Sequence, residues 1–305
     1  MENPEQREEG SRQAAFNSKV KCNKQDKIVT LIIYSDFNIL DKPKPWWKNP
    51  LDECSVKDLI SKVNHFQQAI TSAVDNKSDE LFWKGYIELH LERYLLECIS
   101  AESNITLDIS YHLARKVQNL HSAIIDTFPS IFFSDLQIDR FTPEFAKQLH
   151  QKIGNRLIKN AGQYKMKFVM AVQENYIYIA PDLIENRMEV LFRQCREKFE
   201  DTDLQLEDAI KYGAYFLVYF LTIHPFMNKN GRVARLLLSY LLSKFTVIPL
   251  SLYTGEKARN VYLQCLHKAR YQDPFKSSAL ASFILECVYR TSYNMCIMMD
   301  IDISN

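Results

Sequence analysis

Glycine and proline are scarce in this sequence, with seven Gly and ten Pro in 305 residues. All-β folds need many tight turns, which these two residues favour, so their scarcity argues for a mainly helical protein. None of the seven cysteines forms a C-x-x-C pair, which argues against a zinc site or a disulfide framework. The net charge of +1 lacks the basic excess of a protein built mainly to hold nucleic acid or an anionic membrane.

Targeting and membrane-spanning segments are also missing from the pattern. The amino terminus reads MENPEQREEGSRQ, which has neither the basic n-region nor the apolar h-region of a secretory signal. The most apolar run, residues 214–223, is too short to span a bilayer and is typical of a buried helix. We therefore expect a reduced, cytoplasmic protein without nucleic-acid or membrane partners.

Changes in composition and hydrophobic period divide the chain. Residues 1–27 are polar without apolar periodicity, and we expect a flexible tail there. Residues 28–134 begin with the β-prone run IVTLIIY and then become mainly helical. Residues 135–290 continue the helical pattern with one interruption, and residues 291–305 form a carboxyl tail.

Within residues 135–290, the apolar period predicts helices interrupted by one hairpin. Thr142 before Pro143 predicts a helix start, because Thr caps well and Pro suits the first helical position. Two β-prone runs, 165–172 and 176–179, are separated by polar residues and predict a small hairpin. Residues 206–223 are apolar nearly all round, as a central helix would be, and the helical pattern resumes over 233–245.

The segment that carries chemistry lies between two apolar helices and reads HPFMNKNGRVAR over residues 224–235. Backbone N–H groups of Asn230, Gly231 and Arg232 would lie at a helix N-terminus, which favours an anion. Arg232 and Arg235 share one helical face, and their guanidinium groups suit phosphate oxygens. Taken singly, His224 would be a capping residue and the arginines a solvated surface; their concentration around one loop favours a polyphosphate site beside a histidine.

This segment resembles the signature of the Fic family, His-Pro-Phe-x-(Asp/Glu)-Gly-Asn-Gly-Arg-x-x-Arg. The matching positions are His224, Pro225, Phe226, Asn230, Gly231, Arg232 and Arg235. Residues 162–165 (GQYK) resemble the Gly-x-Tyr-Arg segment that precedes the family's hairpin flap. The resemblance covers about residues 100–290 and implies a mostly α fold with a small β-hairpin flap. It makes residues 135–290 a helical Fic (Fido) catalytic core, and residues 28–134 a mainly helical amino-terminal region with an accessory or inhibitory role.

The resemblance implies a nucleotidyltransferase that moves AMP from ATP to a Ser, Thr or Tyr hydroxyl of a target protein, with AMP removal as a further activity. His224 would be the catalytic base that takes the proton from that hydroxyl, which its ordinary pKa of about 6.5 suits. The hairpin flap would bind the target segment as an added strand. A homodimer and a different phosphate-linked group both stay open.

The same resemblance assigns the nucleotide-binding residues. Asn230, Gly231 and Arg232 would form the anion hole for the α- and β-phosphates, and Arg235 would hold the γ-phosphate. Of the family's paired tyrosines over the adenosine, only the second is present, as Tyr262.

Two positions depart from the signature. Asn228 stands where the family has the acidic residue that binds Mg²⁺ (or Mn²⁺), so we expect weakened metal binding there. Lys229 replaces a glycine and either repels the metal or partly substitutes for it. An autoinhibited enzyme is the favoured interpretation, and a degenerate Fic domain that binds nucleotide or a partner protein without turnover is the alternative.

Many Fic proteins carry an inhibitory helix whose Glu pairs with the second arginine of the signature. Residues 98–106 (CISAESNIT) resemble it loosely, with Glu102 as the inhibitory residue. A rival alignment uses Asp75 in TSAVDN, residues 71–76. An ordinary solvated Glu at a helix end is a third interpretation of Glu102.

Overall fold

The computed structural model describes residues 37–39, 55–76, 80–102, 111–128, 136–171, 176–253, 257–271 and 277–303. The predicted tail 1–27 and the β-prone run 28–34 lie outside these residues. The described residues are mostly α-helical, with a two-stranded antiparallel sheet, which confirms the predicted fold class.

The helices, in chain order, are α2 (Val56–Asn76), α3 (Glu80–Glu102), α4 (Tyr111–Thr127), α5 (Pro143–Gly154), α6 (Ile184–Phe199), α7 (Leu206–Ile223), α8 (Asn230–Leu241), α9 (Ala258–Tyr271) and α10 (Ser278–Met298). Short 3₁₀ turns at Ile138–Arg140 and Pro181–Leu183 precede α5 and α6. Strands β1 (Met170–Ala171) and β2 (Tyr176–Ile177) pair with Met170 opposite Ile177.

Helix α7 is the centre of the core, as its apolar sequence predicts. It packs against α6, α8, α9 and α10, so nearly all of its sides are buried. Aromatic side chains fill the space around it; Phe141, for example, stacks on Phe192 with ring centroids 4.6 Å apart. This packing holds the carboxyl end of α7, and the loop that follows it, on a rigid support.

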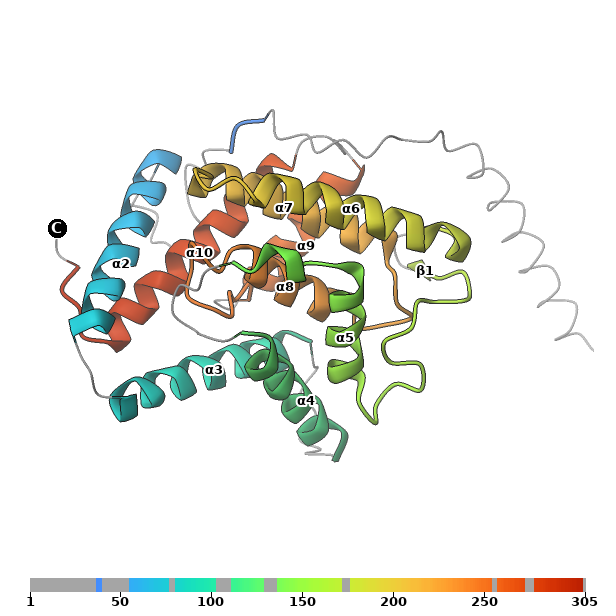
Figure 1. Ribbon diagram of the computed structural model, residues 1–305, viewed down its shortest axis with the longest axis horizontal. Helices are drawn as coiled ribbons and strands as arrows, with labels where there is room; N and C mark the ends of the chain where they lie inside the picture. The colour runs from blue at the N-terminus through green and yellow to red at the C-terminus, as the bar shows by residue number, and fades with distance from the viewer. Residues whose placement is uncertain are drawn as a thin grey trace, which may run out of the picture.

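The amino-terminal helices lie at the edges of this core (Figure 1). Helix α2 packs along α10, where Phe66 meets Tyr289 and Tyr293 at 5.5 and 6.1 Å between ring centroids. Helix α4 packs on α5 and α3. Elements from the amino-terminal region therefore contact both ends of the core sequence.

The predicted cap of α5 is present, because the Thr142 side chain accepts the N–H of Phe145 at 3.2 Å. Other element boundaries differ from the predictions. Helix α8 begins at Asn230 rather than near residue 233, because the polar turn ends sooner than the apolar period indicates. Helix α10 continues to Met298, into the predicted carboxyl tail, and the paired part of the hairpin is shorter than predicted.

Within the described part of the chain, no helix is long and apolar enough to cross a membrane. The cysteines described there form no disulfide, and all are buried: Cys98, Cys195, Cys265, Cys287 and Cys296.

Candidate functional site

The loop between α7 and α8 is bracketed by two residues in the left-handed backbone region. His224 ends α7 with φ of 51°, and Lys229 precedes α8 with φ of 58°. A non-glycine residue in this region costs roughly 1–2 kcal/mol. Such backbone strain persists only where the surroundings hold it, and it is typical of functional sites.

Phe226 and Asn230 anchor the loop from inside. The Phe226 ring is buried and stacks on His150 at 3.9 Å between ring centroids, while the Gly162 N–H donates to Nδ1 of His150 at 2.8 Å. Asn230 binds the backbone of Phe226 twice: its Oδ1 accepts the N–H at 2.9 Å and its Nδ2 donates to the carbonyl at 2.8 Å. The Asn230 side chain therefore holds the loop, and only its backbone N–H is offered to a ligand.

Lys165 holds the chain on both sides of His224. Its backbone N–H donates to the Pro225 carbonyl at 2.8 Å, and its Nζ donates to the Ile223 carbonyl at 3.3 Å. Burial lowers the pKa of Lys165 to about 8. A single residue at the start of the hairpin thus braces the strained turn that carries the histidine.

The His224 imidazole lies in an aromatic and cationic environment. Tyr178, which follows β2, stacks on it at 3.8 Å between ring centroids. Lys165 and Arg270 lie over the Tyr178 ring at 5.4 and 5.9 Å. Burial, then the charges of Lys165 and Arg270, lower the pKa of His224 to about 3, against a small opposing effect of the Leu221 carbonyl. The imidazole is therefore neutral at pH 7 and can accept a proton, but it is a weaker base than the ordinary pKa of about 6.5 led us to expect.

The first turn of α8 offers groups that suit an anion. The N–H groups of Asn230 and Gly231 precede the first intrahelical hydrogen bonds and point out of the helix end. The N–H of Arg232 already donates to the Lys229 carbonyl at 3.1 Å. Arg232 would therefore bind an anion through its guanidinium and not through its backbone N–H. A Cβ on Gly231 would meet Nη1 of Arg235 at 3.2 Å, which places the Arg235 guanidinium against this same turn.

Arg235 is buried and has a neutral partner. Its Nη1 donates to the Tyr253 hydroxyl at 2.7 Å, and its guanidinium carbon lies 4.5 Å from the centroid of that ring. Tyr262 lies edge-on to Tyr253 at 5.9 Å and also meets Phe283. At 2% exposure, Tyr262 is a core residue on the Arg235 side of the site.

The position that corresponds to the family's metal ligand lacks the carboxylate that Mg²⁺ prefers. Asn228 is exposed, and its neutral amide replaces the carboxylate of the family signature. Among the residues that the structure describes, no three His, Cys, Asp or Glu side chains cluster as a metal would require. The charged groups that act on His224 are cations, Lys165 and Arg270. The chain's own residues are therefore the groups to which chemistry can be assigned.

The two candidate inhibitory acids lie on different helices. Helix α3 ends at Glu102, as the inhibitory alignment requires, but the Glu102 side chain lies outside the described residues. Asp75 is exposed near the end of α2. The hydroxyl of Tyr253 accepts a hydrogen bond from Arg235.

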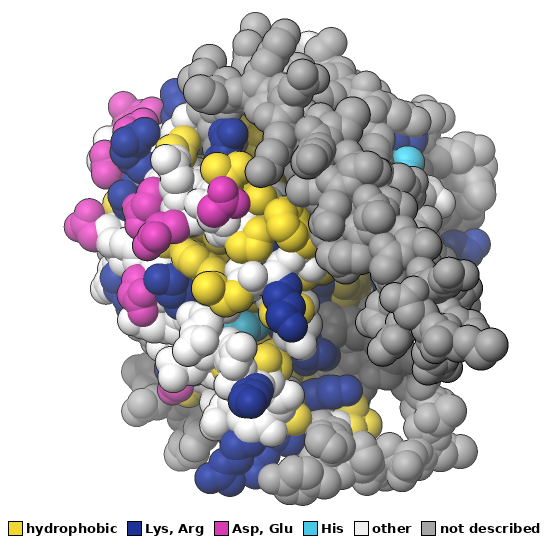
Figure 2. All heavy atoms as spheres, turned by 90° about the vertical axis from the view of Figure 1, so that its right-hand side faces the viewer, with side chains coloured by type: hydrophobic (Ala, Val, Ile, Leu, Met, Phe, Trp, Pro, Cys, Tyr) yellow, Lys and Arg dark blue, Asp and Glu magenta, His cyan; other side chains and the backbone are white. Residues whose placement is uncertain are grey.

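The face that carries the hairpin is electrostatically uneven. Figure 2 shows Lys and Arg side chains near a partly exposed histidine in its lower half, whereas acidic side chains gather at its upper left edge. A basic surface beside a histidine suits an anionic ligand.

Comparisons with known proteins point to the Fic family. Residues 140–242 match the model of the Fic/DOC family. A protein adenylyltransferase Fic from Nematostella vectensis is 23% identical over 272 residues, covering 80% of this chain and 60% of that protein. A ribonucleoside-diphosphate reductase small chain from Ostreid herpesvirus 1 (isolate France) is 28% identical over 109 residues, covering 33% of this chain and 19% of that protein. The chain thus spans less than two thirds of either relative.

Among solved structures, a Fic domain-containing signaling protein from Bacteroides thetaiotaomicron aligns with a TM-score of 0.61 at 16% identity. The alignment covers 80% of this chain and 100% of the Bacteroides chain. At this identity the likeness establishes the fold.

Fold and site together define a class of helical proteins in which a histidine-bearing loop leads into an arginine-bearing helix, with a short hairpin alongside. Residues 140–242 of the chain match the Fic/DOC family. The predicted resemblance is confirmed.

Three residues beside His224 and Arg235 were not among the sequence-based candidates: Tyr178, Arg270 and Tyr253. One signal was available, since Tyr176 and Tyr178 are two apart in a strand and so share a face; Arg270 lies over both rings, at 5.2 and 5.9 Å. Nothing in the sequence links Tyr253 to Arg235, because their proximity depends on the path of the chain after α8.

Proposed function

We propose that this chain is a Fic-type nucleotidyltransferase that moves AMP from ATP to a Ser, Thr or Tyr hydroxyl of a target protein. The observation that carries the proposal is the pairing of a neutral, strained His224 with a helix N-terminus against which Arg235 is packed. A base and an anion site joined by one short loop are what transfer of a phosphate-linked group to a hydroxyl requires.

In the proposed reaction, the target hydroxyl oxygen attacks the α-phosphorus of ATP and gives its proton to His224. The new O–P bond forms as the bond between the α-phosphorus and the bridging oxygen breaks, and pyrophosphate leaves. Nδ1 of His224 is buried, so Nε2 is the nitrogen available to the proton. The N–H groups of Asn230 and Gly231, with Arg232 and Arg235, would stabilise the charge that develops on the phosphates.

The hairpin would present the target. Strands β1 and β2 form a two-stranded sheet, and Tyr178, directly after β2, contacts the His224 ring. A target segment that adds to this sheet as a strand would bring its side chains toward the histidine.

A non-catalytic role is the second candidate, favoured by Asn228 and Lys229. Without a carboxylate at position 228, the phosphates would lack a metal-bridged orientation, and the site would hold nucleotide or a partner segment without turnover. ATP remains the expected ligand in this alternative.

The test is incubation with α-labelled ATP and Mg²⁺ or Mn²⁺, with self-modification and a candidate target as readouts. Label that appears in the wild type and disappears in His224→Ala supports transfer. His121→Ala, an exposed histidine on α4, is the matched control and should retain the label. ATP binding by calorimetry without label under either metal would instead support the non-catalytic role.

A further inference from the structure

Arg235 is oriented by a neutral side chain. Tyr253 accepts one N–H of the guanidinium at 2.7 Å and lies against its face at 4.5 Å. Both side chains are buried, with exposures of 3% and 8%. A carboxylate in this position would cancel the charge of Arg235, whereas a tyrosine hydroxyl fixes its direction and leaves the positive charge for a phosphate.

The same guanidinium nitrogen lies close to the first turn of α8. Nη1 of Arg235, which binds Tyr253, is also the atom that a Cβ on Gly231 would meet at 3.2 Å. The guanidinium therefore lies between the Tyr253 hydroxyl and the first turn of α8, where unpaired helix N–H groups point outward. Movement of Tyr253 would release it from this turn.

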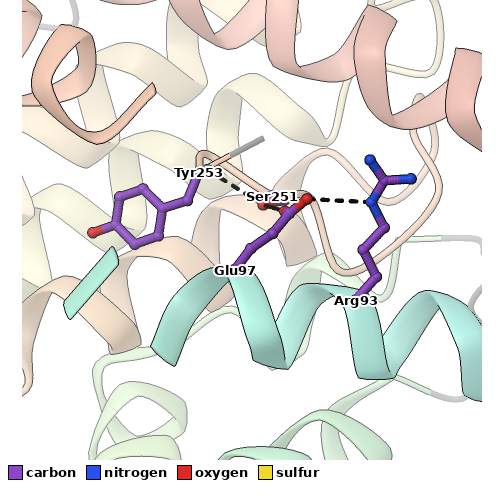
Figure 3. Close-up of polar contacts among 4 residues, drawn as sticks. All are labelled: Arg93, Glu97, Ser251 and Tyr253. Carbon is purple, nitrogen blue, oxygen red and sulfur yellow. Dashed lines mark hydrogen bonds and ion pairs between the residues drawn. The ribbon is translucent and has the colours of Figure 1, made fainter. Parts of the chain in front are cut away.

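Tyr253 is in turn held by a residue of α3. Its backbone N–H donates to Oγ of Ser251 at 3.2 Å, and the Ser251 hydroxyl donates to the Glu97 carboxylate. The other carboxylate oxygen accepts from Nε of Arg93 at 3.2 Å. Figure 3 shows Glu97 and Arg93 on α3, with Ser251 between Glu97 and Tyr253. A contact from the amino-terminal region thus reaches the residue that orients Arg235.

We propose that Tyr253 is a positioning residue that aims Arg235 at the terminal phosphate of a nucleoside triphosphate, and that Glu97 on α3 fixes Tyr253 through Ser251. This inference rests on the proposed function, because it assigns a triphosphate to the α8 site. It makes the discrimination between ATP and ADP depend on α3, a helix outside the segment that matches the family model.

The test compares ATP and ADP affinities by calorimetry in the full chain. Tyr253→Phe keeps the ring and removes the hydroxyl, and it should lower ATP affinity about fivefold, as the loss of one ordinary hydrogen bond implies, with ADP affinity within twofold. Glu97→Ala should lower ATP affinity about threefold. Glu97→Gln should restore it, because its amide oxygen still accepts the Ser251 hydroxyl. In an Arg235→Ala background, Tyr253→Phe should have no further effect.

Glu92→Ala is the matched control, since Glu92 is an exposed acid on the same helix, and it should change neither affinity. Circular dichroism melts identify any variant that fails to fold, and Ser251→Ala then replaces it. Equal losses for ATP and ADP, or no loss in Tyr253→Phe, overturn the inference while the proposed function stands. No ATP binding in the wild type overturns both.

Discussion

Three histidines that the fold keeps neutral should make this protein labile to mild acid. Burial lowers the pKa of His90 and of His150 to about 4, in each case against a hydrogen bond from the imidazole to a backbone carbonyl, and lowers that of His224 to about 3. Their ordinary pKa is 6.5. The unfolded chain therefore takes up protons as pH falls below 6.5, whereas the folded chain does so only near pH 4 to 3. The stabilisation is complete above pH 6.5 and is lost progressively below it.

The size of the effect follows from these values. Between pH 7 and pH 5, each histidine with a pKa of about 4 in the folded state contributes about 2 kcal/mol of lost stability. His224 contributes a similar amount, so the three together remove about 6 kcal/mol. That is a large part of the 5–15 kcal/mol typical of a folded protein.

Urea unfolding at pH 7, 6 and 5 measures this loss directly. His90→Gln and His150→Gln should each reduce the drop between pH 7 and pH 5 by about 2 kcal/mol, whatever their effect at pH 7. His121→Gln, at an exposed position on α4, should leave the drop unchanged. If both buried-site variants show the wild-type drop, these histidines are not held neutral by the fold and the reasoning fails.

Other expectations concern the site itself. Lys229→Gly should raise the free energy of unfolding by about 1 kcal/mol in urea titrations, because glycine adopts φ of 58° without strain. Asn228→Asp should tighten ATP binding in Mg²⁺ but not in EDTA. If calorimetry shows that the ATP affinity of this variant does not depend on the metal, residue 228 is not the metal position. Glu102→Gly should raise ATP affinity severalfold if α3 is inhibitory; a rise in Asp75→Gly instead would place the inhibitory acid on α2. Hydrogen exchange over residues 165–179 should slow when a target peptide binds, and slow exchange there in the free protein would contradict a clamp.

The fold class could be predicted because helical periodicity is local information. The central position of α7 followed from its all-round apolar sequence, and the start of α5 from Thr142 and Pro143. The end of α8 was harder to predict, because the apolar pattern continues past Leu241 into a turn whose side chains are also buried.

The sequence predicted the loop that carries the candidate site, but not the residues from other elements that surround it. His224, Asn230 and Arg235 are close in sequence, so one segment brings them together. Lys165 and Tyr253 reach that segment through tertiary packing, which no local pattern encodes. The hydrogen bonds of the Asn230 side chain to the loop backbone could not be predicted either, because the sequence does not distinguish an amide that caps a loop from one that binds a ligand.

The two hydrogen bonds of Lys165 mechanically couple the hairpin to the turn that carries His224. Lys165 lies five residues before Met170 of β1, and its two hydrogen bonds end on the residues that flank His224. A force applied along the hairpin by a bound segment would therefore reach the histidine through a connection of five residues. A target that seats in the wrong register would pull the base out of line, so selectivity for the modified hydroxyl would arise from alignment as well as from affinity.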